Sequence, residues 1–288
     1  MISFATYSEQ LKIAPLDNGI SYWEKGNGPV LLFLHGALGN GYTWRKILPE
    51  LSQHFRCIAI HLPLGGHQIA LSKQTDLSPA GISRLLNDFV EYLKLDRFTI
   101  VANDTGGAYA QVFASLYPQR IRGMILSNCE VKKVFPPASF VYLRYAVHIP
   151  YFLFVMSRLF SKKKWLKSSF VLGKLSVQVT SEELSQGYVH SFVHDPAIRD
   201  DFKKAVIHWR PYYTITAAKK LQTFQSPVLI IWGGLDTSLF PKKLMQQLLN
   251  VFPHAEWQEI PEARTYIQED APEKTIQLIN KFINEKLN

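Results

Sequence analysis

The stretch FTIVANDTGG, residues 98–107, decides the fold of this chain. Its first six residues form a short apolar run that is typical of a buried strand, and the residues after it predict a helix. Small residues, Ala102 and Gly106, stand two positions before and two positions after Asp104. A very sharp turn between strand and helix needs this spacing, because larger side chains would clash beside it, and it lifts the central side chain above the sheet. The pattern therefore marks Asp104 as a candidate reactive group.

Short apolar runs alternate with helical patterns on both sides of this turn. We expect strands at 29–35, 55–62, 98–103, 124–129, 227–232 and 256–260, and helices at 44–51, 78–94, 107–117, 242–251 and 273–286. Nearly continuous apolar runs are typical of strands buried on both faces of a parallel sheet. Residues 2–24 alternate more weakly and predict two antiparallel strands. The sequence thus predicts an α/β fold with a mostly parallel, doubly wound sheet of eight strands.

Residues 131–215 interrupt this alternation. They are helix-like, rich in aromatic residues and inserted between two predicted strands, so we expect a helical cap on a core formed by residues 1–130 and 216–288. Ligands of open α/β sheets bind at the carboxyl ends of the strands, where such a cap would close over them.

The cap segment is also the basic part of the chain. Residues 131–174 contain nine Lys or Arg and no Asp or Glu, which equals the whole net charge of +9. The apolar residues 140–160 are interrupted by charged residues and proline, which argues against a membrane span. We expect either a solvated basic lid or a weak contact of the cap with an acidic surface or membrane.

Composition limits the remaining functions. With 288 residues, of which 47% are hydrophobic and 19% charged, the chain can form one soluble globular domain with a large core. Residues 1–10 lack the basic start and apolar run of a signal peptide, so we expect a cytoplasmic protein. Cys57 and Cys129 lie in predicted strands and are expected to be buried free thiols. We expect no cofactor, no metal and no nucleic-acid partner, but a small-molecule substrate; the oligomeric state stays open.

Four further motifs accompany the turn. They are HGA at 35–37, PLGGH at 63–67, Asp236 after the WGG at 232–234, and EDAP at 269–272. With these motifs the chain resembles the α/β-hydrolase superfamily over essentially its full length. The resemblance implies that Asp104 occupies a nucleophile elbow, and aspartate there is similar to haloalkane and fluoroacetate dehalogenases and epoxide hydrolases. In these enzymes a carboxylate, which needs no base to activate it, attacks carbon and forms an ester.

The same resemblance assigns the rest of a site. The backbone N–H groups of Ala37 and Thr105 match the oxyanion-hole donors. The substrate pocket is expected to include residues next to these motifs, namely His35, Asn103, Trp44, Thr265 and Tyr266. Asp236 and Glu130 compete for the role of the acid, and either can instead be a structural hydrogen-bond acceptor. A plainer alternative for Asp104 is that it only caps the following helix.

The usual catalytic histidine is missing from its position. Thr265 stands there, and no histidine follows His254, which precedes the last predicted strand. Attack by the carboxylate needs no histidine, but hydrolysis of the resulting ester normally needs a base that activates water.

Three interpretations follow. In the first, a relocated histidine is the base, and His67 is the best placed because its loop leaves the carboxyl end of a strand. In the second, Asp104 is a general acid or base that shares its proton with Asp236 or Glu130. In the third, catalysis is lost and the pocket binds a ligand or a partner.

The substrate class is only partly indicated. Thr105 follows Asp104 where haloalkane dehalogenases have tryptophan and the fluoroacetate type has arginine, which disfavours dehalogenation. Epoxide hydrolases use two cap tyrosines, and this cap offers Tyr142, Tyr145, Tyr151, Tyr188, Tyr212 and Tyr213. Such aromatic residues can equally line an apolar pocket. We therefore expect a hydrolase that acts on a small apolar ester, epoxide or halide through Asp104 with an incomplete triad, or alternatively an inactive ligand-binding or regulatory protein of the same fold.

Overall fold

One mixed β-sheet organises the molecule. The computed structural model describes residues 3–168 and 172–287, and within them eight strands form a sheet in the order β1-β2-β4-β3-β5-β6-β7-β8. The strands are β1 (Lys12–Ala14), β2 (Ile20–Lys25), β3 (Val30–Leu34), β4 (Arg56–Ile60), β5 (Phe98–Asn103), β6 (Ile121–Ser127), β7 (Val228–Gly233) and β8 (Ala255–Ile260). β2 pairs antiparallel with β1 and β4, and the other neighbours are parallel. The predicted mostly parallel eight-stranded sheet is confirmed.

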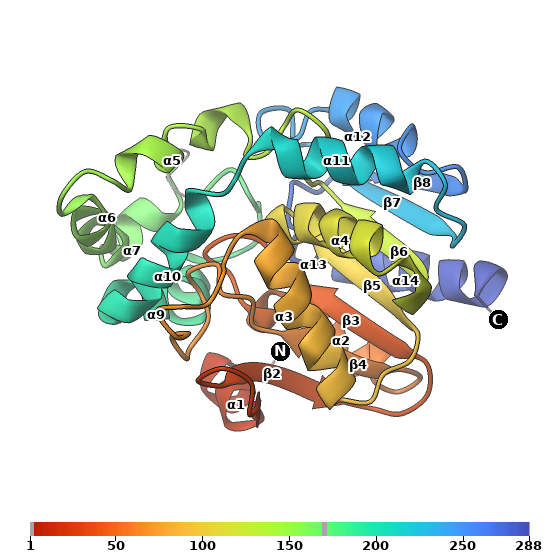
Figure 1. The fold of residues 1–288 in the computed structure, drawn as a ribbon, viewed down its shortest axis with the longest axis horizontal. Helices are drawn as coiled ribbons and strands as arrows, with labels where there is room; N and C mark the ends of the chain where they lie inside the picture. Colours follow the sequence, from red (N-terminus) through yellow and green to blue (C-terminus); the bar gives the residue numbers. More distant parts are fainter. Residues whose placement is uncertain (1–2, 169–171, 288) are drawn as a thin grey trace.

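Helices cover both faces of this sheet. The main core helices are α3 (Pro79–Tyr92), α4 (Thr105–Leu116), α11 (Pro211–Leu221), α12 (Lys242–Leu249) and α14 (Pro272–Lys286). Figure 1 shows α3, α4 and α11 side by side across one face, with α14 behind the sheet. The oxygen of Ser78 caps α3 by accepting a hydrogen bond from the Gly81 amide at 3.1 Å.

The N-terminal segment differs in part from the expectation. β1 and β2 are the two predicted antiparallel strands, but residues Phe4–Glu9 form a helix, α1, before them. The side chain of Ser3 accepts a hydrogen bond from the Thr6 amide and so caps this helix, while Tyr7 packs into the core. A local cap and one buried aromatic residue thus override a weak alternating pattern.

The segment between β6 and β7 lies to one side of the core. Its helices are α5 (Leu143–Ala146), α6 (Phe152–Phe160), α7 (Lys163–Leu166), α8 (Ser181–Glu183), α9 (His190–His194) and α10 (Pro196–Val206). Figure 1 shows them, in green to turquoise, at the left of the sheet. The next helix, α11, already packs along α4 of the core, so the expected boundary at residue 215 falls inside a helix.

Candidate active site

A strained turn presents Asp104 at the carboxyl end of β5. The strand ends at Asn103 and α4 begins at Thr105, so Asp104 alone joins them, with φ 55° and ψ −139°. A positive φ is unfavourable for a residue with a side chain and is found where a site requires it. A Cβ added to Gly106 would lie 2.5 Å from the Leu34 carbonyl oxygen, so the helix can start this close to β3 only with glycine there. Asp104 forms no N-cap hydrogen bond, which argues against the plain capping role.

A cavity of about 120 Å³ lies above this turn. The core contributes Ala37, Leu38, Asp104, Thr105 and Glu130 to its lining, and the segment between β6 and β7 contributes Pro136, Pro137, Phe140, Tyr142, Leu143, Met156, Leu159, Phe160, Leu172, Leu175, Phe202 and Trp209. The indole N–H of Trp209 donates to the Tyr109 hydroxyl at 3.1 Å and is not free to bind a ligand. Among the described lining residues, the polar side chains left to meet a ligand are Asp104, Thr105, Glu130 and Tyr142, so the cavity is an apolar chamber with two carboxyl groups.

The surroundings of Asp104 favour its protonated form. The pKa of its carboxyl group is raised from 3.8 to about 7, chiefly by burial and to a smaller extent by the negative charge of Asp236. The backbone amide and the hydroxyl of Thr105 act in the opposite direction. Near neutral pH, Asp104 therefore exists in both forms, unlike an ordinary exposed aspartate.

Glu130 is the second carboxyl group of the cavity. It is fully buried, and burial, followed by the charge on Asp104, raises its pKa well above the usual value. The Thr105 hydroxyl donates to its Oε1 at 3.1 Å, whereas its Oε2 has no hydrogen-bond partner among the described residues. Since each charge disfavours the other, the pair retains a proton near neutral pH. Asp104 can then be ionised while Glu130 remains an acid.

Asp236, the other candidate acid, has a different setting. Its Oδ1 accepts hydrogen bonds from the amides of Leu239 at 3.0 Å and Phe240 at 3.2 Å, and its Oδ2 accepts one from the Thr265 hydroxyl. It is buried and does not line the cavity. The Thr265 hydroxyl thus contacts Asp236 at the position where the family resemblance predicts the imidazole of a catalytic histidine. A threonine hydroxyl is not a base at neutral pH.

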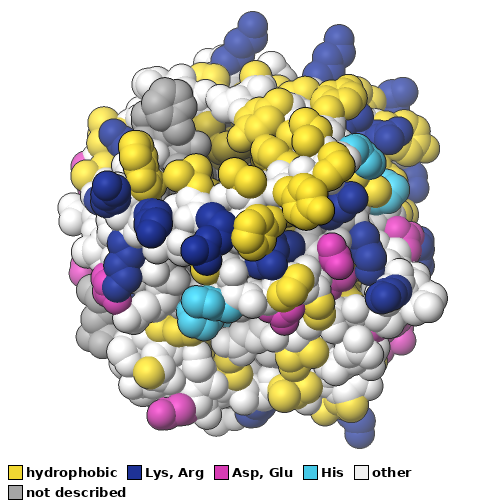
Figure 2. All heavy atoms as spheres, turned by 90° about the vertical axis from the view of Figure 1, so that its left-hand side faces the viewer, with side chains coloured by type: hydrophobic (Ala, Val, Ile, Leu, Met, Phe, Trp, Pro, Cys, Tyr) yellow, Lys and Arg dark blue, Asp and Glu magenta, His cyan; other side chains and the backbone are white. Residues whose placement is uncertain are grey.

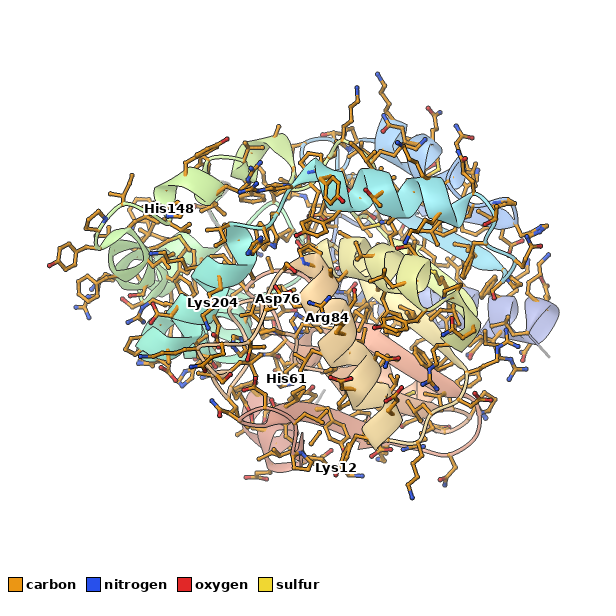
Figure 3. All side chains as sticks on the ribbon, in the orientation of Figure 1. Lys12, His61, Asp76, Arg84, His148 and Lys204 are labelled. Carbon is orange, nitrogen blue, oxygen red and sulfur yellow. The ribbon has the colours of Figure 1, made fainter. Side chains whose placement is uncertain are left out.

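The structure does not bring His67 to Asp104. Its Nε2 lies 3.3 Å from Asp201 Oδ2 on α10, and it lines a separate cavity of about 10 Å³. Lys204 of the same helix, labelled in Figure 3, contacts Asp201 Oδ1 at 3.3 Å. The side chain of His67 therefore forms a polar contact with α10 and not with the reactive turn. No histidine occurs among the described residues that line the Asp104 cavity.

Sequence comparison identifies the family of this chain. A family model described as alpha/beta hydrolase fold matches residues 29–272. The chain belongs to this family. It is 27% identical over 268 residues to haloalkane dehalogenase 2 of Mycobacterium tuberculosis, covering 88% of each chain. It is 26% identical over 288 residues to epoxide hydrolase 3 of Xenopus tropicalis, covering 93% of this chain and 76% of that protein.

Solved structures agree on the fold of this α/β hydrolase. A putative lipase from Acinetobacter baumannii aligns with a TM-score of 0.78 at 21% identity, over 99% of this chain and 97% of that one. At this identity the likeness shows the fold alone.

Several residues expected in the pocket of this α/β hydrolase support the site from outside the cavity. His35 donates through Nδ1 to the Gly36 carbonyl at 2.8 Å and accepts through Nε2 from the Leu62 amide at 2.7 Å. Burial lowers its pKa to about 4, so it is neutral and both nitrogens are occupied. Asn103 donates to the Thr265 carbonyl at 2.7 Å and so fixes the Thr265 loop to β5.

Trp44 and Tyr266 are also removed from the cavity. Trp44 packs on Phe33 inside the core, with ring centroids 5.3 Å apart, and Tyr266 stacks on Tyr188 at 5.9 Å. Their expected place in the lining was wrong because large aromatic residues beside the motifs fill the core instead. The side chains that do line the cavity come mainly from the cap segment. The sequence signal that could have identified part of this lining is the helical spacing of the apolar residues Met156, Leu159 and Phe160 on α6.

Proposed function

We propose that this α/β hydrolase opens small apolar epoxides through an ester on Asp104, with Glu130 as the proton donor and acceptor. One observation carries this proposal. Asp104 and Glu130 line the same apolar cavity, contact Thr105 in common, and have pKa values raised by burial. Pairs of carboxyl groups held in different protonation states divide the roles of nucleophile and acid in this way.

In the first step, the ionised carboxylate of Asp104 attacks one epoxide carbon. The C–O bond of the ring breaks, and Glu130 gives its proton to the oxygen that is released. The products are a hydroxyalkyl ester on Asp104 and a Glu130 carboxylate. A neutral acid in an apolar cavity suits this step, because the oxygen gains negative charge as the bond breaks.

In the second step, the Glu130 carboxylate accepts a proton from water, and the resulting hydroxide attacks Cγ of Asp104. The N–H groups of Ala37 and Thr105 would stabilise the oxyanion that forms. Collapse expels the alkoxide, which takes the proton from Glu130, and the new carboxylic acid on Asp104 returns its proton to Glu130. The net reaction adds water to the epoxide and gives a diol. Glu130 thereby replaces the histidine that would otherwise activate water.

An epoxide fits this cavity better than a halide. A departing halide needs N–H donors, yet Thr105 follows Asp104 and the indole N–H of Trp209 is bonded to Tyr109. An epoxide needs a proton donor for oxygen, and Glu130 supplies one. Tyr142 alone among the six tyrosines named above lines the cavity, so the proposal does not rely on a pair of cap tyrosines.

A second candidate function is binding without turnover. The hydrogen bond of Thr265 to Asp236 favours it, because it closes the place at which a base would stand. In this case the cavity would hold a small apolar ligand and Asp104 would not react.

Intact-mass spectrometry separates the two functions. The protein is incubated with styrene oxide, and the reaction is quenched within the first turnover. The mass of the intact protein and of its proteolytic peptides is then measured. The proposed hydrolase gives a styrene-oxide adduct on the peptide with Asp104 and then a diol, and the Asp104→Asn variant gives neither. Asp236→Asn is the matched control, which should still form the adduct. Binding of styrene oxide without adduct or diol would support the binding protein and contradict the hydrolase.

A further inference from the structure

The cap segment exposes an apolar surface on the side away from the core. We define the cap outer face by six side chains of α5 to α7 and their connections, with exposed fractions of 47–81%: Tyr145, Ile149, Tyr151, Phe154, Val155 and Trp165. Figure 2 shows hydrophobic side chains gathered on this side of the molecule. Single exposed apolar residues are ordinary, but a gathered group of large ones marks a surface that contacts something else.

Helix α6 gives this surface its shape. Phe154, Val155 and Leu159 lie on its exposed side, with 53%, 62% and 41% of each residue accessible. Ser157 and Phe160 are buried on the inner side. A helix that is apolar on both sides is expected to be covered on both. On the inner side of α6, Phe160 packs on Phe192 of α9 and lines the cavity. Nothing in the described part of the chain covers the outer side.

Cations surround the apolar side chains. Arg158, Lys162 and Lys164 are exposed at the end of α6 and the start of α7, and Figure 2 shows Lys and Arg side chains beside the apolar group. In the described part of the chain, only Lys163 of the nine cations in residues 131–174 forms an ion pair, with Glu182. Apolar and aromatic side chains next to uncompensated cations are the composition of an interfacial surface that binds anionic lipid.

We propose that the cap outer face docks on an anionic membrane surface. The apolar side chains would enter the region between headgroups and acyl chains, and the cations would contact the lipid phosphates. In residues 3–168 and 172–287 no helix is long and apolar enough to cross a membrane, so the contact is a peripheral one. A second copy of the chain is the poorer partner, because a two-fold interface would bring the same cations together.

Docking has a consequence for the cavity. Tyr142 and Leu159 line it and are also 53% and 41% exposed, next to the cap outer face. An apolar substrate dissolved in the bilayer would therefore reach the cavity directly. This consequence rests on the proposed function, whereas docking itself does not.

Vesicle co-sedimentation tests the cationic part of the proposal. The full chain is mixed with vesicles of phosphatidylcholine alone or of phosphatidylcholine with phosphatidylglycerol, at low and high salt. We expect binding to the anionic vesicles only, weakened by salt. The triple variant Arg158→Gln, Lys162→Gln, Lys164→Gln should lower the partition coefficient by about fivefold for each cation removed, or roughly 100-fold in total.

A charge-matched variant on other faces is the control. Lys25, Lys243 and Lys274 are exposed outside the cap segment. Their combined replacement by Gln changes the net charge equally but should lower partitioning far less than the cap variant. Equal losses in the two variants would mean that net charge alone attracts the protein, and would overturn the proposal.

The apolar part has its own variants. The double variant Phe154→Gln, Val155→Gln should lower partitioning by about tenfold or more, because two apolar side chains that would be buried in the membrane are replaced by polar ones. Ile13→Gln, at a residue that is 60% exposed elsewhere, should leave it unchanged. Thermal unfolding of each variant confirms that it folds. Three results would overturn the proposal: equal binding to both kinds of vesicle, indifference to the Phe154 and Val155 changes, or absence of vesicle binding together with self-association that these changes abolish. The last result would identify a second copy as the partner.

Discussion

Two buried carboxyl groups follow neighbouring strands, and they differ in their hydrogen bonds and in their access to the cavity. Asp236, after β7, has both oxygens in hydrogen bonds with Leu239, Phe240 and Thr265. Glu130, after β6, faces the cavity and has one oxygen without a partner among the described residues. A carboxylate whose hydrogen bonds are complete stabilises a loop, whereas a protonated carboxyl group with an unused oxygen can exchange a proton with a ligand. We infer that the proton chemistry of this site belongs to Glu130 and not to Asp236.

The largest expected effect is the loss of the nucleophile. Asp104→Asn should slow the consumption of a small apolar epoxide by on the order of 10⁴-fold, because the amide cannot form the ester. Single-turnover kinetics measure this rate, with Asp236→Asn as the control. A similar loss in both variants would remove the distinction between the two regions.

Replacement of the proposed proton donor comes next. Glu130→Gln should lower the rate of both steps by about 10²- to 10³-fold, because a positioned acid or base contributes about this much. The variant should also lose the alkaline decline of the pH–rate profile, in which Glu130 becomes ionised. The rise on the acid side, near the Asp104 pKa of about 7, should remain. An unchanged profile would assign the acid to another group.

The raised pKa of Asp104 also predicts a pH-dependent stability. Since its folded value of about 7 exceeds the ordinary value of 3.8, ionisation is less favourable in the folded protein. The contribution of this group to the free energy of unfolding is fully present below pH 3.8 and is lost as the pH rises toward about 7. Relative to Asp104→Asn, the wild-type protein should therefore be less stable at pH 8 than at pH 5, by about 2–3 kcal/mol. Urea unfolding of both proteins at the two pH values measures this difference, and a constant difference would contradict the raised pKa.

The Asp236 region should respond in stability more than in rate. Thr265→Val removes the hydroxyl that donates to Asp236 and should cost about 1–3 kcal/mol of unfolding free energy, because a buried carboxylate loses a partner. The epoxide rate should stay within about tenfold of the wild-type rate. A large rate loss in a fully folded variant would mean that Thr265 takes part in the reaction.

The smallest effect is electrostatic. Asp236→Asn removes a negative charge that raises the pKa of Asp104, so the acid side of the pH–rate profile should move to lower pH. The height of the profile should change little. A shift to higher pH would show that the charge of Asp236 acts on a different group.

The sequence predicted correctly those features that depend on local backbone geometry and on burial. Small residues around Asp104 and continuous apolar strands predict the turn and the sheet, because both depend on local steric limits and on burial. The cavity lining was harder to predict, because it depends on which side of α6 and its neighbours faces the core. His67 shows the same limit: its loop position suggested a relocated base, but a tertiary contact with Asp201 directs it elsewhere. The raised pKa of Glu130 likewise arises from burial that no motif encodes.

A single turnover in ¹⁸O-labelled water tests the central claim most directly. The protein is used in excess over a small apolar epoxide, and the label is located by mass spectrometry in the diol and in the peptide that contains Asp104. If Asp104 forms the ester and Glu130 directs water to its Cγ, the label appears in the Asp104 carboxyl group and not in the first molecules of diol. Label in the diol alone would mean that water attacks the epoxide directly, and would contradict the covalent role of Asp104.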